Sequence, residues 1–101
     1  MSAKHELKCW PGPFQEVWLG LKTFEVRKDD RNYQVGDGVK LKEFVPGAWN
    51  GEYTGREIWN LRITSKLVGG QFGIEPGYCV LSLSEGRDCR DYSKRTGAAQ
   101  D

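Results

Sequence analysis

The chain has 101 residues and a formal net charge of +1, with 38% hydrophobic and 29% charged residues. A chain of this length forms one small domain with a single modest core. The charge balance excludes a protein that holds duplex nucleic acid mainly through its phosphates, because such proteins are much more basic. Any contact with nucleic acid is therefore expected to be local, and directed at a base or a short single strand.

The three cysteines, Cys9, Cys79 and Cys89, are widely spaced and form no Cys-x-x-Cys or Cys/His cluster. The pattern therefore indicates no metal site, and no cofactor is expected. Cys9 and Cys79 fall in predicted strands, where we expect them to be small core residues. The chain shows no signal peptide and no apolar run of membrane length, so the expected compartment is the cytoplasm, with no membrane partner.

The first predicted elements are a strand over residues 5–10 and a short helix. Proline and glycine at 11–13 end the strand, because proline cannot donate to a ladder. Apolar residues then follow at the i, i+3, i+4 and i+7 spacing of a helix, namely Phe14, Val17, Trp18 and Leu21. Gly20 is expected to end this helix. His5, the single histidine, is expected to be solvated and is a weak binding candidate.

Residues 20–28 run from the end of this helix into a strand in which polar and apolar residues alternate. Successive side chains on a strand point to opposite faces, so Phe24 and Val26 are expected to enter the core. The other face gathers the polar residues Lys22, Thr23, Glu25 and Arg27. Such a face is either a solvated surface with a cross-paired salt bridge or the floor of a polar binding site.

Three more strands are predicted after a polar loop that contains Tyr33 and the turn residue Asp37. The first spans residues 39–44, with Lys40 and Lys42 on a small basic face that is expected to be solvated. A polar loop over 46–55 holds the Asn-Gly signal of a hairpin turn.

The longest predicted strand, residues 57–67, alternates Trp59, Leu61 and Ile63 with polar neighbours, and its length suggests a bend across a small barrel. The last strand covers 78–83. The glycine-rich loop between them, residues 69–77, lacks the lysine and serine of a nucleotide-triphosphatase phosphate loop.

The pattern as a whole predicts a mostly β domain (α+β) of about five strands and one early helix, closed into part of a barrel, because no βαβ repetition is present. Residues 1–84 form the predicted domain. Residues 85–101 lose their apolar residues and are expected to be a flexible or peripheral polar tail that carries Cys89.

Five short motifs occur in order along residues 5 to 83. They are His5-Glu6-Leu7-Lys8, Gly20-x-Lys22-Thr23-x-Glu25-x-Arg27-Lys28, Tyr33-Gln34-Val35-Gly36-Asp37, Tyr53-Thr54-Gly55-Arg56 and Gly69-Gly70-Gln71-Phe72-Gly73. In this order the chain resembles the DUF3850 branch of ASCH domains, within the PUA-like superfamily, a branch of bacterial and phage proteins. The resemblance implies a β-barrel of five or six strands with one or two short flanking helices.

The resemblance also implies binding of RNA, single-stranded nucleic acid or a modified nucleotide in a cleft beside the Gly-x-Lys segment. The residues proposed to line it are Lys22, Thr23, Glu25, Arg27, Trp10, Gln71 and Phe72. A carboxylate such as that of Glu25 accepts hydrogen bonds from an exocyclic amine. The cations meet phosphate, and an aromatic ring that stacks on a base contributes ~1–3 kcal/mol.

A second reading comes from ASCH-like amidohydrolases that act on acetylated cytidine. Lys22 matches their catalytic lysine, but Glu25 stands where they carry a catalytic threonine. The alternative function is thus a small hydrolase, of amidohydrolase or ribonuclease type, with Lys22 and Glu25 as an acid/base pair. A third reading is a protein-interaction domain. The sequence leaves open the oligomeric state and the choice between RNA, DNA and a free nucleoside.

Overall fold

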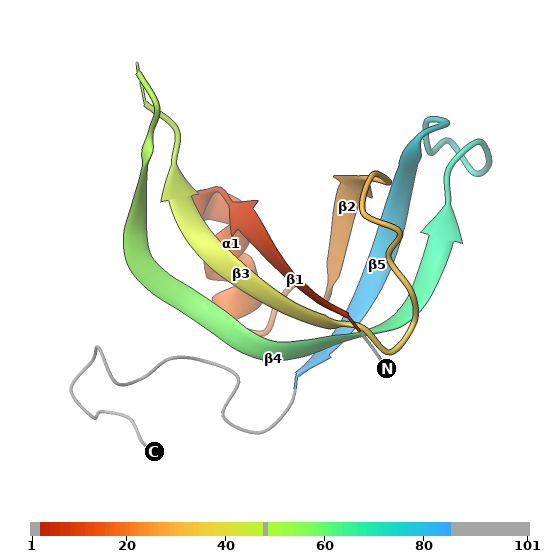
Figure 1. Cartoon of the computed structure of the whole chain (residues 1–101), viewed down its shortest axis with the longest axis horizontal. Coiled ribbons are helices and arrows are strands. Elements are labelled where there is room, and N and C mark those ends of the chain that lie inside the picture. Colours follow the sequence, from red (N-terminus) through yellow and green to blue (C-terminus); the bar gives the residue numbers. More distant parts are fainter. Residues whose placement is uncertain (1–2, 48, 86–101) are drawn as a thin grey trace.

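The computed structural model describes residues 3–47 and 49–85. In this part of the chain a five-stranded mixed sheet curls into a half-barrel, with one short helix packed against it (Figure 1). The elements are β1 (Lys4–Cys9), α1 (Pro11–Trp18), β2 (Phe24–Lys28), β3 (Gly38–Val45), β4 (Glu52–Val68) and β5 (Tyr78–Glu85). The predicted mostly β fold is confirmed. The predicted tail lies outside the described residues apart from Glu85, and so does Cys89.

The strand β4 gives the half-barrel its shape. Its residues 52–62 pair with β3, and its residues 61–68 pair with β5, both antiparallel. Because one strand serves two partners in turn, the sheet bends along it into the open curve seen in Figure 1. The hairpin turn that joins β3 to β4 contains Gly51 at φ 73°, as the Asn-Gly signal predicts, although β4 begins inside the predicted loop.

The alternation of β4 is interrupted at Asn60, which adopts a left-handed backbone conformation with φ 59°. The pairing with β3 shifts register at the same place. Such a bulge places an extra residue in one strand and reverses which side chains face inward. Ile58 and Leu61 are therefore both buried, whereas Trp59, expected on the same face as Leu61, is 43% exposed.

The sheet order is β1-β3-β4-β5-β2, so β1 and β2 form its two edges. The edge strand β1 pairs in parallel with β3, and the edge strand β2 pairs antiparallel with β5. These two edges face each other across the open side of the half-barrel (Figure 1). The open side is therefore bounded by backbone that no described strand pairs with.

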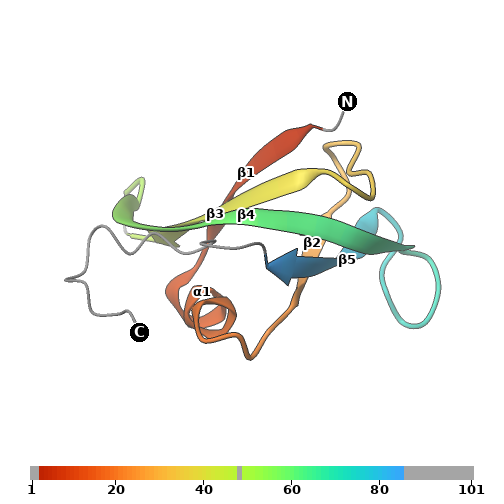
Figure 2. The ribbon, with the colours of Figure 1, turned by 90° about the horizontal axis from the view of Figure 1, so that it is seen from below.

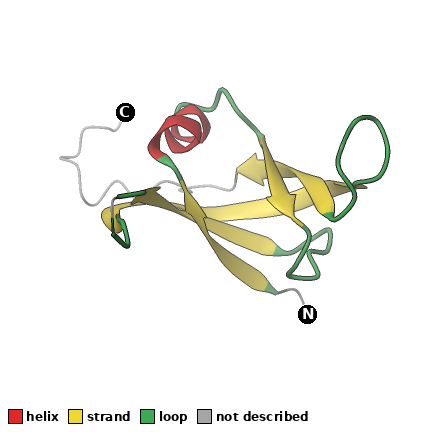
Figure 3. Cartoon of the chain, turned by 90° about the horizontal axis from the view of Figure 1, so that it is seen from above, coloured by secondary structure: helices red, strands yellow, loops and turns green. Residues whose placement is uncertain are grey.

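The helix α1 begins after β1 with proline in its first turn, a position that tolerates a missing N–H. Figures 2 and 3 show the helix, with the loop that leads from it to β2, on one side of the sheet. Phe14, Val17 and Trp18 are buried there, as the apolar spacing predicts. Leu21 was expected to join them but is 76% exposed, because the helix ends at Trp18 and Gly20 turns the chain away at φ 80°.

The core lies between the inner face of the sheet and α1. Both cysteines of the described residues, Cys9 and Cys79, are buried and unbonded, as expected. Tyr33 is also fully buried, although it was predicted to lie in a polar loop. The core members are Leu7, Cys9, Phe14, Val17, Trp18, Tyr33, Val39, Leu41, Ile58, Leu61, Ile63, Cys79, Leu81 and Leu83.

His5 is buried, which corrects the expectation that it is solvated. Its Nε2 atom lies 2.8 Å from Oδ2 of Asp37, and its ring packs edge-on against Tyr33 with centroids 4.7 Å apart. Asp37 also accepts hydrogen bonds from the backbone N–H groups of Ala3 and Gln34, at 3.1 and 3.0 Å. The pair therefore joins the first strand to the turn before β3, and Asp37 caps that turn as expected.

The faces of β2 are the reverse of the prediction. Glu25 is only 5% exposed and faces the inside of the half-barrel, whereas Phe24 and Val26 are 45% and 53% exposed on the outside. The alternation is therefore correct, but the polar side faces inward. The reason is that β2 borders the open side, where Lys22 and Arg27 lie against the buried carboxylate.

Candidate functional site

The polar face of β2 forms a compact charged cluster. The Nζ atom of Lys22 lies 3.4 Å from Oε2 of Glu25, and Nη1 of Arg27 lies 3.6 Å from Oε1 of the same carboxylate. Lys22 and Arg27 are themselves half-buried, with side chains 16% and 23% exposed. A buried carboxylate is costly unless opposite charges or donors surround it, so the two cations offset part of the cost of burying Glu25.

Arg27 also crosses the open side of the half-barrel. Its Nη1 and Nη2 atoms both donate to the carbonyl oxygen of Lys8 on β1, at 3.1 Å each. Further along the same gap, Arg31 donates to the carbonyl of Glu6 at 3.0 Å. Side chains thus connect the two edge strands in place of a ladder. These arginine side chains bridge the gap between the strands, and a pocket remains beside them.

A pocket of about 360 Å³ lies in that gap, next to the charged cluster. One wall is the end of β1 and the start of α1, and the other is β2. Its lining residues are Lys8, Cys9, Trp10, Pro13, Lys22, Glu25, Val26, Arg27, Lys28 and Tyr78. Four of these carry positive charge and one carries negative charge. With four cations and one acid the pocket lining has a net charge of +3, in a chain whose net charge is +1.

Four of the seven predicted site residues line the pocket: Lys22, Glu25, Arg27 and Trp10. The other three lie elsewhere. The carbonyl of Thr23 accepts a hydrogen bond from the N–H of Leu83 and so belongs to the sheet. Gln71 donates from Nε2 to the carbonyl of Val68 at 2.7 Å, within its own loop. Phe72 is 83% exposed on that loop.

The glycine loop has a structural reason for at least one of its glycines. A Cβ atom at Gly69 would overlap the carbonyl oxygens of Glu75 and Tyr78. The N–H of Gly69 donates to the carbonyl of Tyr78 at 2.8 Å, and the N–H of Gly70 donates to that of Ile74 at 2.7 Å. The close approach that glycine permits here is thus made by the loop itself.

Lys28 and Tyr78 are among the six pocket residues that were not predicted as site residues. Tyr78 begins β5 and lies opposite Lys28 in the β2–β5 pairing. Lys28 has no ion-pair partner among the described residues. Lys28 directly follows Arg27 in the charged motif, so its place in the site could have been predicted from the sequence. The position of Tyr78 depends on a strand pairing between distant segments, which no local pattern indicates.

Cys9 lines the pocket from β1, but it is not suited to act as a nucleophile. Burial, helped by the negative charge of Glu25, raises the pKa of its thiol to about 12. The thiol therefore stays protonated at neutral pH, and a protonated thiol neither attacks nor ligates. Within residues 3–47 and 49–85, no group of three or more His, Cys, Asp or Glu side chains is placed to hold a metal ion.

A second polar cluster lies where α1 packs against β3 and β4. Glu43 of β3 is buried, accepts a hydrogen bond from Oγ1 of Thr54 at 2.7 Å, and lies 3.8 Å from Nη1 of Arg56. The guanidinium of Arg56 lies over the rings of Phe14 and Trp18, 5.1 and 4.6 Å from their centroids. Arg56, the last residue of the motif Tyr53-Thr54-Gly55-Arg56, thus holds the helix to the sheet.

The outer face of β1, β3 and β4 carries lysines paired with acids. Lys40 lies 3.7 Å from Glu6 and 3.8 Å from Glu57, and Lys42 lies 3.7 Å from Glu6. Both lysines also lie over aromatic rings, Lys40 over that of Trp59. This face is therefore close to neutral and half-buried, rather than a free basic surface.

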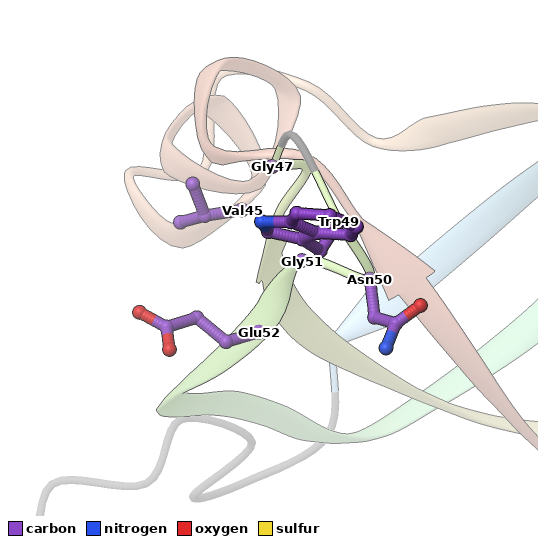
Figure 4. Close-up of a pocket in the computed structure, with 6 residues that line it drawn as sticks. All are labelled: Val45, Gly47, Trp49, Asn50, Gly51 and Glu52. Atoms are coloured by element: carbon purple, nitrogen blue, oxygen red, sulfur yellow. The ribbon is translucent and has the colours of Figure 1, made fainter.

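A second pocket, of about 380 Å³, lies at the tip of the β3–β4 hairpin (Figure 4). Its lining includes Val45, Trp49 and Glu52, with glycine backbone between them. Figure 4 shows the indole of Trp49 lying across the turn near Gly51, with Val45 and Glu52 pointing to one side. Among the residues that the structure describes, no cation lines this pocket, so it does not offer the mixed charges found beside β2.

Fold and site together define a small half-barrel β domain with a charged pocket at its open side. The family model for DUF3850, a domain of unknown function, matches residues 4–83. The chain belongs to this family, as the five motifs predicted.

One relative is a protein of Escherichia phage P2 described as an uncharacterized 12.9 kDa protein in the GpA 3' region. It is 42% identical to this chain over 64 residues, which is 63% of this chain and 54% of the phage protein. The chain thus spans about half the length of the curated relative that it matches. In the described part of the chain, no helix is long and apolar enough to cross a membrane.

Proposed function

We propose that the pocket beside β2 binds one nucleotide of a single-stranded nucleic acid, RNA or DNA. The observation that carries the proposal is the buried carboxylate of Glu25 in a pocket whose lining also includes four cations and two aromatic rings. The family assignment is compatible with this function, and we extend it to the ASCH domains of the PUA-like superfamily on the strength of the motifs.

Each part of the pocket suits one part of a nucleotide. Glu25 makes two contacts of 3.4 and 3.6 Å with cations, which leaves lone pairs of its carboxylate able to accept from a base amine. Trp10 is 60% exposed and Tyr78 is 38% exposed, so each ring offers a face on which a base can stack. Lys22 and Lys28 attract the phosphate.

The size and charge of the pocket favour a single strand over a duplex. A volume of about 360 Å³ is at the small end of ligand pockets, which span ~300–1,000 Å³. A base must leave a duplex before it can enter such a pocket. The chain as a whole carries only +1 net charge, which gives little hold on a duplex backbone.

The test is a titration of fluorescently labelled single-stranded oligonucleotides and of a duplex of the same sequence, followed by anisotropy. We expect the single strands to bind more tightly than the duplex. Lys28→Ala should weaken binding for every sequence and reduce the slope of log K against log salt by about 1, because one phosphate contact is lost. Lys40→Ala is the matched control, since it removes the same charge from the outer face. Equal effects of the two variants, or no binding by the wild type, would contradict the proposal.

A second candidate function is a small hydrolase acting on a modified nucleoside or RNA. It is favoured by the 3.4 Å contact between Lys22 and Glu25, which places a proton donor next to an acceptor inside the pocket. Incubation with acetylated cytidine and with labelled RNA separates the two functions. Product formation that Lys22→Ala abolishes supports the hydrolase, whereas binding without product supports the binding module.

A further inference from the structure

The free edge of β2 carries backbone groups whose direction follows from its pairing with β5. The carbonyl of Thr23 accepts from the N–H of Leu83 at 2.9 Å, and the N–H of Asp29 donates to the carbonyl of Gly77 at 2.8 Å. In an antiparallel pair, residues alternate between those that bond the partner and those that point away from it. The odd-numbered residues of β2 therefore bond β5, and the even-numbered residues present their N–H and C=O to the free edge.

Of the even-numbered residues, Val26 is the one whose backbone is available in the pocket. The carbonyl of Lys28 already accepts from the N–H of Asp30 at 3.0 Å, and Phe24 does not line the pocket. Val26 does line it, although its side chain is on the outer face, opposite to that of Glu25. A pocket that touches both residues runs along the strand edge between them.

We propose that the N–H and C=O of Val26 hydrogen-bond the edge of the base in this pocket, and that together with Glu25 they select a base that carries an exocyclic amine. This inference rests on the proposed function. The N–H and C=O of one residue point to the same side of a strand, so they match a neighbouring acceptor and donor on a base edge.

Glu25 supplies the selectivity, because the Val26 pair alone fits every base. An exocyclic amine has two hydrogens, one for the Val26 carbonyl and one for the Glu25 carboxylate. Adenine, cytosine and guanine have this amine. Uracil and thymine have carbonyl oxygens in its place, and a carboxylate repels a carbonyl oxygen. The ligand class is thus a single strand that contains an amine-bearing base.

The first measurement compares wild-type affinity for short labelled oligonucleotides of adenine, cytosine and uracil. We expect the adenine and cytosine strands to bind roughly tenfold more tightly than the uracil strand. Wild-type binding that is equally tight for all three strands would overturn the inference and leave the proposed function standing. Absence of binding to any strand would overturn both.

The second measurement removes one backbone donor. Val26→Pro deletes an N–H that makes no ladder bond, and proline is tolerated on an edge strand. We expect it to weaken binding of the adenine strand by about threefold to tenfold. Phe24→Pro removes the equivalent N–H outside the pocket, so this variant should bind as the wild type does.

Thermal melting checks that each variant is folded. If Val26→Pro is folded and binds the adenine strand as tightly as Phe24→Pro does, the inference is wrong. If Val26→Pro is unfolded, the decision rests on the comparison of adenine, cytosine and uracil strands with the wild type, which involves no substitution.

Discussion

Three carboxylates, those of Glu25, Asp37 and Glu43, are buried in the described residues, and each meets a different set of donors. Asp37 lies within 3.1 Å of three nitrogen atoms, and Glu43 accepts a hydroxyl at 2.7 Å. Glu25 has two cations at 3.4 and 3.6 Å. Buried polar groups usually have close partners, so the looser contacts of Glu25 distinguish it as a group able to bind a ligand.

Asp37 is a structural carboxylate, and its contribution depends on pH. The hydrogen bond with His5, followed by those from the backbone of Gln34 and Ala3, lowers the pKa of Asp37 below its ordinary value of 3.8. A carboxyl whose pKa is lower in the folded state stabilises the fold above its unfolded pKa. That stability is lost as the pH falls from there through the folded pKa.

We therefore predict that Asp37→Asn lowers the free energy of unfolding at neutral pH and flattens its decline in acid. Urea denaturation from about pH 7 down to about pH 3 measures this, and the difference between wild type and variant should shrink as the pH falls below about 4. Asp30→Asn, in the exposed loop after β2, is the control. A difference that stays constant down to the lowest pH would contradict the assigned role.

The elements are held together by contacts that cross between them, most clearly at α1. The helix has eight residues, too few to be stable alone in water. Its buried side chains pack on the sheet, and Arg56 of β4 covers Phe14 and Trp18 while donating to Gln15 at 2.9 Å. One arginine therefore links the helix to β4 and, through Glu43, to β3.

Arg56→Ala should lower the free energy of unfolding by about 2 kcal/mol, because it removes two cation–π contacts and leaves Glu43 without its cation. Arg56→Lys keeps the charge but not the planar stack, so a smaller loss is expected. Urea denaturation measures both. Arg62→Ala, which removes an exposed bond to the Gly36 carbonyl, is the comparison. A loss for Arg56→Ala no larger than that for Arg62→Ala would contradict this account of the helix.

Local patterns were sufficient for most elements of the fold. The helical spacing of Phe14, Val17 and Trp18 and the Asn-Gly turn both predicted what the structure contains. The face of β2 was predicted the wrong way round, because the alternation of a strand does not say which side is inside. In an open half-barrel the inward side of an edge strand can be polar when cations accompany its carboxylate.

The candidate site was predictable only where its residues are close in sequence. Lys22, Glu25 and Arg27 share one strand and its approach, so the motif brought them together. Tyr78 joins them through pairing of β2 with β5, and Phe72 lies apart because its loop closes on itself. Both outcomes depend on long-range geometry that local patterns do not contain.

The whole molecule is an open half-barrel whose two edges are joined by arginine side chains. Arg27 belongs both to this connection and to the pocket. It donates to the Lys8 carbonyl across the gap, and it lies beside Glu25 in the pocket. A ligand in this pocket would contact both edge strands at once. Binding should therefore perturb residues of β1 and β2 together, although these two strands lie at opposite ends of the sheet order.

The most direct measurement of the central claim is an NMR titration of the labelled protein with a short single-stranded adenine oligonucleotide. We predict that the shift changes gather at the Trp10 indole, at residues 22–28 and at Tyr78, with little change at Phe72 or at the Trp49 indole of the hairpin tip. Shift changes centred on the glycine loop or on the hairpin tip, or no changes at all, would contradict the account.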